Sequence, residues 1–205
     1  MIQTKKMITK KTPLILASAS PRRKMLLSSI KLPFRVVASK VKEDCFPDEP
    51  VKTTMHLAEK KALDVYTENE PLWVLGADTL VAVNDTVLGK PCSRNDAIHM
   101  LSLLSGRKHM VVTGFCIINP FGIAVHSEAV KTDVFIKKLD SNEITNYVNT
   151  KEPFDKAGAY AIQGIGSFMV EGICGSYTNV VGLPIPQVIN ALVSLGALKH
   201  FPLSP

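Results

Sequence analysis

The hydrophobic pattern of the N-terminal third predicts two short strands and two helices. Residues 14–18 (LILAS) form a short apolar run that is typical of a buried strand. Ser20 and Pro21 match the N-cap and first position of a helix that continues through RRKMLLSSI. Residues 34–38 predict a second strand, and apolar residues recur at helical spacing over 53–66, which predicts an amphipathic helix.

The middle of the chain is rich in β-prone segments. The sequence WVLGADTLVAV (73–83) predicts a strand, an acidic break at Asp78 and a second strand. A helix is expected over 93–104, where the sequence begins with a pattern similar to a capping box. The segments 108–118 and 123–137 partly alternate apolar and polar residues, as the strands of a hairpin do.

The C-terminal third adds helices, and the whole pattern indicates the fold class. Helices are predicted over 141–149 and 184–195, with a glycine-rich stretch between them. Helices combined with several adjacent β segments favour an α/β or α+β sheet protein over a helical bundle. No linker rich in Pro, Gly or Ser divides the chain, so residues 12–205 are expected to form one domain, folded in one or two lobes. Residues 1–11 are expected to be a flexible extension.

Composition narrows the functional classes. Apolar residues make up 46% of the 205 positions and charged residues 20%, which is typical of a folded globular protein. The net charge of +6 favours an anionic partner, but the scattered basic residues and few aromatics argue against nucleic-acid binding. No apolar run approaches the ~20 residues that cross a bilayer. The four cysteines are widely spaced, so we expect a reduced, cytoplasmic protein that does not enter a membrane.

Two adjacent arginines stand where a helix disfavours positive charge. Arg22 and Arg23 fall in the first turn of the predicted helix, whose dipole opposes cations by a few tenths to ~1 kcal/mol. A bound polyphosphate would remove this conflict, because the helix N-terminal amides and both guanidinium groups would face it. The alternative is a solvated surface pair, and spacing alone does not decide between the two.

Asp78 is the second prominent candidate. A carboxylate that follows the apolar WVLG would stand at the end of a strand, where α/β proteins place catalytic groups, and the alternative is a turn aspartate. Glu43 and Asp44 lie in an acidic loop and would complete a Mg²⁺ site with Asp78, although a solvated acidic cluster explains them equally well. Lys90 follows a glycine and Lys61 lies on a predicted helix, so each is a phosphate ligand or a plain surface residue.

One glycine-rich stretch is a candidate for ligand binding, and two common site types are excluded. DKAGAYAIQGIG suits either a loop that folds against a ligand or an ordinary turn, and its Gln163 would read a base through its amide donor and acceptor. The histidines lack zinc-binding spacing, so no zinc site is expected. The absence of G-x-S-x-G argues against a serine hydrolase.

Several of these stretches, in order along the chain, resemble the Maf family of nucleoside triphosphate pyrophosphatases. The stretches that carry the resemblance are LASASPRRKMLL (16–27), LAEKKA (57–62), LGADTLVAVNDTVLGKP (75–91), MLSLLSGRKHMVVTG (100–114) and DKAGAYAIQGIGSFMVEGICGSYTNVVGLP (155–184). Together they cover nearly all of residues 14–195, and several long motifs in one order are far more specific than any one of them.

The resemblance implies a fold and an activity. The implied fold is α/β, with a mixed sheet and two lobes around a cleft, related to the inosine triphosphatase type. The implied reaction is hydrolysis between the α and β phosphates of a nucleoside triphosphate, giving the monophosphate and pyrophosphate with Mg²⁺ or Mn²⁺. SPRR, GADT and DKAGAYAIQG resemble the branch acting on dTTP and UTP rather than the one acting on 7-methyl-GTP. A homodimer is the family-based expectation.

The resemblance also implies roles for single residues. By motif position Asp78 corresponds to the family's proposed general base, and Glu43 to a carboxylate that binds the metal with it. The substrate-binding positions are Ser18, then Arg22, Thr79 and Gln163 for substrate choice, and Arg23, Lys61 and Lys90 for phosphate contact. Lys42 stands where the family commonly has an acidic residue, so Asp44 is an alternative to Glu43.

Two other functions stay open at this point. The family name derives from septum formation, so a nucleotide-binding regulator of cell division without turnover is an alternative to the enzyme. A cleft for another phosphorylated metabolite is a third reading. Whether the substrate is a standard or a modified pyrimidine triphosphate also stays open. The two differ by as little as one methyl group, and the motifs do not show whether the pocket has room for it.

Overall fold

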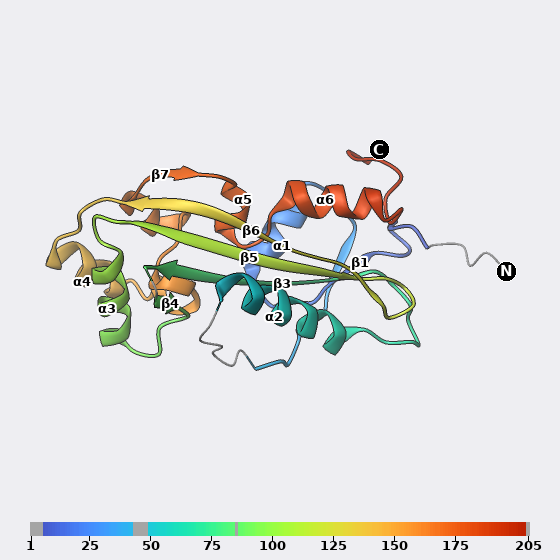
Figure 1. The fold of residues 1–205 in the computed structure, drawn as a ribbon, viewed down its shortest axis with the longest axis horizontal. Helices are drawn as coiled ribbons and strands as arrows, with labels where there is room; N and C mark the ends of the chain where they lie inside the picture. The colour runs from blue at the N-terminus through green and yellow to red at the C-terminus, as the bar shows by residue number, and fades with distance from the viewer. Residues whose placement is uncertain (1–5, 43–48, 85, 204–205) are drawn as a thin grey trace.

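The computed structural model describes residues 6–42, 49–84 and 86–203, and a mixed β-sheet forms its centre (Figure 1). The strands are β1 (Leu14–Leu16), β2 (Phe34–Val36), β3 (Val74–Val83), β4 (Thr86–Leu88), β5 (Lys108–Ile118), β6 (Ala124–Ile136) and β7 (Val170–Cys174). They lie in the order β2-β1-β3-β5-β6-β7, with β4 paired to β3. β1 is parallel to β2 and β3, and the other described pairs are antiparallel. The predicted α/β class with a mixed sheet is therefore confirmed.

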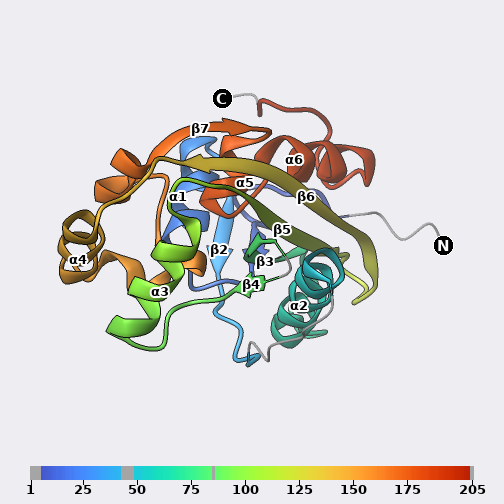
Figure 2. The same cartoon turned by 60° about the vertical axis from the view of Figure 1, so that its left-hand side comes forward.

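Helices cover both faces of this sheet. They are α1 (Pro21–Ser29), α2 (Pro50–Val65), α3 (Arg94–Leu104), α4 (Ser141–Asn149), α5 (Tyr177–Val181) and α6 (Ile185–Ser194), with short 3₁₀ helices η1 (Glu152–Asp155), η2 (Ala157–Ala159) and η3 (Gly164–Met169). Helix α2 lies against one face, and α1 and α6 lie against the other (Figures 1 and 2). None of the helices in the described ranges has the length and apolar character that a bilayer crossing needs.

The alternation of side chains along β1 explains why both faces are covered. Leu14 and Leu16 belong to the core beneath α1 and α6, whereas Ile15 packs on the opposite face with Ala58 and Ala62 of α2. Successive side chains of a strand point to opposite faces, so a strand that is apolar at every position needs a partner on each side. The continuous apolar run in the sequence therefore marks a central strand.

A separate core forms at the far ends of the long strands β3 and β5. There Val83 and Val111 pack with Leu101 and Leu104 of α3 and with Tyr147 of α4. β3 takes part in both cores, with Leu75 in the first and Val83 in the second. Residues 78–80 lie between the cores, and the fold thus has two lobes with the middle of β3 at their junction.

The predicted acidic break at Asp78 is wrong. β3 is one continuous strand of ten residues, and Asp78 pairs with Gly114 of β5 in its interior. The residue is buried, with an exposed fraction of 4%. The expectation failed because it treated a buried carboxylate as unpaired, whereas Lys61 of α2 compensates its charge.

Two glycines let α2 lie directly on the sheet. A Cβ atom on Gly76 would stand 2.0 Å from the carbonyl oxygen of Ala58, and one on Gly114 would stand 2.4 Å from the carbonyl carbon of Thr54. Both distances are far below van der Waals contact, so only glycine permits this approach of helix and strand. The backbone of α2 is consequently close enough for its side chains to reach β3.

Helix ends agree with the predicted ranges to within a few residues, and the predicted N-cap residues Ser20 and Ser93 stand at the starts of α1 and α3, although each cap lacks one of its side-chain hydrogen bonds. Ser20 occupies the N-cap of α1 without a capping hydrogen bond from its side chain. Asp96 completes only half of a capping box, because its carboxylate accepts from the Cys92 amide and not from that of Ser93. Of the segment 1–11 expected as an extension, residues 6–11 are described, and there Ile8 is buried and its amide donates to Ala197.

Candidate active site

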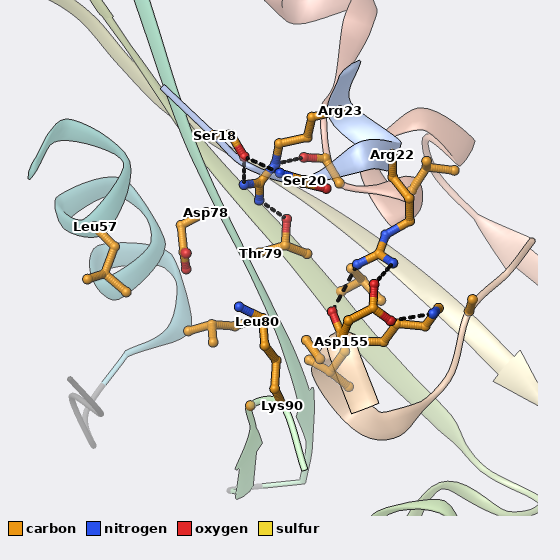
Figure 3. Close-up of a pocket in the computed structure, with 18 of the residues that line it drawn as sticks. Ser18, Ser20, Arg22, Arg23, Leu57, Asp78, Thr79, Leu80, Lys90 and Asp155 are labelled. Carbon is orange, nitrogen blue, oxygen red and sulfur yellow. Dashed lines mark hydrogen bonds and ion pairs between the residues drawn. The ribbon is translucent and has the colours of Figure 1, made fainter. Parts of the chain in front are cut away.

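A cleft of about 1020 Å³ opens at the junction of the two lobes (Figure 3). It is lined by all eight described residues that the sequence predicted for catalysis or substrate binding, namely Ser18, Arg22, Arg23, Lys61, Asp78, Thr79, Lys90 and Gln163. The predicted metal ligand Glu43 and its alternative Asp44 lie outside the described residues. The structure therefore brings together side chains from the loop after β1, from α1, α2 and β3, and from the loops after β4 and η2.

The cleft lies beside an open edge of β3. β1 pairs with this strand at Val74 and Leu75, and β4 pairs with it over residues 81–83. Between these two contacts no strand of the described chain pairs with this edge, while β5 continues along the other edge. Side chains at positions 78–80 thus border the cleft while the strand keeps its place in the sheet.

Asp78 and Lys61 form a buried ion pair on the α2 face of β3. The Nζ atom of Lys61 lies 2.6 Å from Oδ1 of Asp78, and their side chains are 8% and 6% exposed. Asp78 follows Gly76 by two residues and shares its face, where the close approach of α2 brings Lys61 within reach. Removing one partner of such a pair leaves an uncompensated buried charge. Lys61, predicted as a phosphate contact, therefore also holds the Asp78 carboxylate in place.

Arg23 connects three parts of the cleft wall from a buried position. Its Nε donates to the carbonyl of Gly182 at 2.7 Å, Nη1 donates to Ser18 Oγ at 3.0 Å, and Nη2 donates to Thr79 Oγ1 at 3.0 Å. The residue is 8% exposed, although it stands in the first turn of α1. These bonds compensate the unfavourable helix dipole, so Arg23 holds two predicted substrate-binding hydroxyl groups.

Arg22 points to a different part of the cleft and pairs with an aspartate from the second lobe (Figure 3). Its Nη1 lies 2.9 Å from Oδ2 of Asp155, and its Nη2 donates to the Asp155 carbonyl at 3.2 Å. Lys156 Nζ contacts the other carboxylate oxygen at 2.5 Å. Burial raises the pKa of Asp155, but the Lys156 hydrogen bond and the charges of Lys156 and Arg22 outweigh this and lower it.

Lys90 and Gln163 also line the cleft. Lys90 extends from the end of β4 toward Asp78 and Leu80 (Figure 3). Gln163 is half-buried after η2, and its Nε2 donates to the Tyr177 hydroxyl at 3.0 Å. Both residues line the same cleft as the arginines, and their roles in substrate binding stay predictions.

A comparison with protein-family models shows which family this chain belongs to. The family model described as Maf-like protein matches residues 13–195, which is most of the chain. This chain belongs to the Maf family. The resemblance of the sequence motifs to that family is thereby confirmed over the predicted range.

Curated relatives of this Maf-family chain cover nearly its whole length. A dTTP/UTP pyrophosphatase from Citrifermentans bemidjiense is 50% identical over 93% of this chain and 100% of its own length. The dTTP/UTP pyrophosphatase of Aquifex aeolicus is 43% identical over 90% of this chain and 96% of its own. A solved structure of a nucleoside-triphosphatase / dITP/XTP pyrophosphatase from Mycobacterium abscessus aligns over 89% of this chain and 97% of its own with 12% identity and a TM-score of 0.38.

Sequence reasoning did not identify the partners that hold these side chains in the Maf-family cleft. In the sequence Asp155 is only part of a glycine-rich stretch, and no role is predicted for Thr113 or Asn179. Thr113 Oγ1 lies 2.9 Å from Thr79 Oγ1 and donates to the carbonyl of Asn179 at 3.0 Å. The available signal was a single hydroxyl in the apolar sequence MVVTGFCII, since a buried polar side chain requires a partner.

A second buried polar pair lies behind the cleft wall. Tyr160 lines the cleft, and its hydroxyl lies 2.7 Å from Nε2 of His109 on β5. Burial lowers the pKa of His109 to about 4, although the charge of Asp133 acts in the opposite direction. Burial also raises the pKa of Tyr160. His109 is therefore neutral at physiological pH and positions Tyr160 as an uncharged wall of the cleft.

Proposed function

We propose that this chain is a nucleoside triphosphate pyrophosphatase that hydrolyses dTTP and UTP to the monophosphate and pyrophosphate. The observation that carries the proposal is the buried Asp78 carboxylate on the open edge of β3, in a cleft whose charged lining residues are mostly basic. Relatives 43–50% identical to nearly the whole chain bear the name dTTP/UTP pyrophosphatase, which supports this substrate class.

The charges of the cleft suit a triphosphate. The described lining contains five basic side chains, Arg22, Arg23, Lys61, Lys90 and Lys156, and two acidic ones, Asp78 and Asp155. They come from α1, from α2, from the loop after β4 and from the segment between η1 and η2, so the positive charges reach the cleft from several elements instead of forming one surface stripe. Preorganised cations of this kind stabilise the negative charge that shifts to the leaving phosphates in the transition state.

Asp78 serves as general base in this proposal. It takes a proton from a water molecule whose oxygen bonds to the α-phosphorus, and the bond to the bridging oxygen breaks as pyrophosphate leaves with the electron pair. Lys61 holds Oδ1 at 2.6 Å, which orients the carboxylate and leaves Oδ2 to receive the proton. The burial of both side chains limits competing water around the reacting groups.

A divalent cation, Mg²⁺ or Mn²⁺, belongs to the same proposal. Among the described residues there is no group of three or more His, Cys, Asp or Glu side chains that would hold a metal on its own. This donor set fits Mg²⁺, which binds through one or two carboxylates and substrate phosphate oxygens rather than in an all-protein cage. Asp78, with Glu43 as the family resemblance implies, would hold it, and the bound cation would polarise the phosphoryl oxygens.

The test is pyrophosphate release from a panel of nucleoside triphosphates with Mg²⁺ or Mn²⁺. We expect dTTP and UTP to be cleaved preferentially, and Asp78→Asn to lower kcat by at least ~100-fold, the scale of a lost general base. The asparagine keeps an oxygen that can accept from Lys61 but leaves that buried cation uncompensated, so we expect a folded variant of lower stability, and circular dichroism checks that it is folded at the assay temperature.

Asp133→Asn is the matched control, because Asp133 is also a strand aspartate paired with a lysine, Lys108 at 3.0 Å, outside the cleft. It should retain the wild-type kcat. A folded wild-type protein that releases no pyrophosphate from dTTP or UTP would overturn the proposal, and so would an Asp78→Asn variant as active as the control. The homodimer expected from the family resemblance stays a prediction.

A further inference from the structure

The hydrogen bonds around Thr113 determine which way the hydroxyl of Thr79 points. Thr113 Oγ1 donates to the backbone carbonyl of Asn179 at 3.0 Å, and a carbonyl oxygen only accepts. The single hydroxyl proton of Thr113 is thereby committed. Thr113 also lies 2.9 Å from Thr79 Oγ1, so in that bond Thr79 must be the donor.

Arg23 takes one of the acceptor positions of the same hydroxyl. Its Nη2 lies 3.0 Å from Thr79 Oγ1, and a guanidinium group only donates. The hydroxyl of Thr79 thus donates to Thr113 and accepts from Arg23. It has one lone pair left for a ligand, and its side chain borders the cleft. Any nucleotide group that bonds to Thr79 must therefore be a hydrogen-bond donor.

The hydroxyl of Ser18, which Arg23 also contacts, has the opposite hydrogen-bonding role toward a ligand. Its Oγ accepts from Arg23 Nη1 at 3.0 Å and from the Ser20 amide at 3.3 Å. Both lone pairs are engaged, so Ser18 offers a ligand only its proton. Ionised phosphate oxygens only accept hydrogen bonds, which makes Ser18 suitable for a phosphate and Thr79 unsuitable.

We propose that Thr113 is a positioning residue that fixes Thr79 as a hydrogen-bond acceptor, and that Thr79 accepts from the N3–H group of a uracil or thymine base. The proposal rests on the proposed function, because it assumes a nucleotide in the cleft. Uracil and thymine share the N3–H donor, whereas N3 of cytosine is an acceptor and would face another acceptor at Thr79. Thr113 is completely buried and does not line the cleft, so it acts only through Thr79.

The size of the effect follows from a single neutral hydrogen bond. Such a bond contributes about 0.5–1.5 kcal/mol, which corresponds to about a 2- to 13-fold difference in kcat/KM between matched and mismatched bases. Thr113→Val keeps the shape of the side chain and removes its hydroxyl. Thr79 is then free to rotate its proton toward the cleft and donate to N3 of cytosine. The kcat/KM ratio of UTP to CTP should fall by this factor.

The experiment measures kcat/KM for UTP and CTP with the wild type and three variants. Thr113→Val is the test, and Thr113→Ser restores the hydroxyl and should restore the ratio. Thr132→Val is the matched control, because Thr132 is also a buried threonine of the sheet and accepts from Asn179 Nδ2 at 2.9 Å, but its hydrogen bonds go to Asn179 and Ser176 and not to Thr79. We expect both valine variants to lose thermal stability and only Thr113→Val to change the ratio.

Each outcome separates this inference from the proposed function. A wild type that cleaves neither nucleotide overturns the proposed function. A wild type that cleaves UTP but shows the same UTP/CTP ratio as Thr113→Val overturns the role of Thr113. An equal loss of activity toward both nucleotides in Thr113→Val also overturns it, because a general packing defect or a contact to the sugar has no preference for the base. A lowered ratio that Thr113→Ser restores supports it.

Discussion

His109 should make the stability of this protein fall steeply between neutral and mildly acidic pH. The imidazole is 3% exposed, and its Nδ1 has no hydrogen-bond partner within the described residues. Protonation would place a charge and an unsatisfied N–H in the core behind Tyr160. Burial therefore lowers the pKa of His109 to about 4 from an ordinary value of 6.5.

The sign and magnitude follow from proton linkage. Between pH 6.5 and 4 the unfolded chain binds a proton at His109 that the folded chain does not, so acidification favours unfolding. The two pKa values imply a loss of about 2 kcal/mol between pH 7.5 and 5.0, and of about 3 kcal/mol once the group is fully titrated. Several carboxylates, including Glu152 and Asp155, have lowered pKa values and add a loss of the same sign at still lower pH.

The variant His109→Gln isolates the contribution of this residue. Glutamine places a polar nitrogen or oxygen near the position of Nε2, so the bond to Tyr160 can persist, and it does not titrate. The free energy of unfolding is measured by urea denaturation at pH 7.5 and 5.0, with fluorescence of the single tryptophan, Trp73, which is buried. We expect the wild type to lose about 2 kcal/mol more than the variant over this interval. Equal losses would refute the reasoning, because the carboxylates are common to both proteins.

Two further substitutions test the packing and the electrostatics of the cleft. Gly76→Ala places a Cβ atom 2.0 Å from the carbonyl oxygen of Ala58, so α2 must move. The free energy of unfolding should fall by about 1–3 kcal/mol. Because Lys61 lies on α2 and shifts with it, kcat should fall as well. Asp155→Asn removes the ion pair with Arg22. Because that pair is partly exposed, the free energy of unfolding should fall by less than about 1 kcal/mol. We expect KM for dTTP to rise and kcat to change by less than about twofold.

Matched controls accompany these two variants. Gly172→Ala adds a methyl group to a strand glycine whose surroundings are open, so its unfolding should match the wild type. Glu70→Gln breaks an exposed ion pair with Arg35 away from the cleft and should leave KM unchanged. Wild-type kcat and stability in Gly76→Ala would contradict the close packing of α2. A KM shift as large in Glu70→Gln as in Asp155→Asn would remove any specific role of Asp155.

Local sequence determined most of the elements and the choice of candidate residues. Helix and strand ranges depend on side-chain spacing and on terminal residues within a few positions, which the sequence displays directly. For this reason the hairpin of β5 and β6 and the helix α4 lie where the pattern predicted them. The unfavourable position of the positive charges of Arg22 and Arg23 near a helix N-terminus is also predictable from the sequence, because it depends only on their place in the first turn.

Only the tertiary structure decided what these residues do. Arg22 and Arg23 are adjacent in sequence, yet one pairs with Asp155 from the second lobe and the other is buried between Ser18 and Thr79. Asp78 interrupts an apolar run in the sequence, but Lys61 pairs with it and the strand continues. Groups that are far apart in sequence determine whether a hydroxyl group of the cleft donates a hydrogen bond to a ligand or accepts one. Such partners meet only when the sheet and α2 pack, because charge compensation and proton direction depend on distances of a few ångströms across the fold.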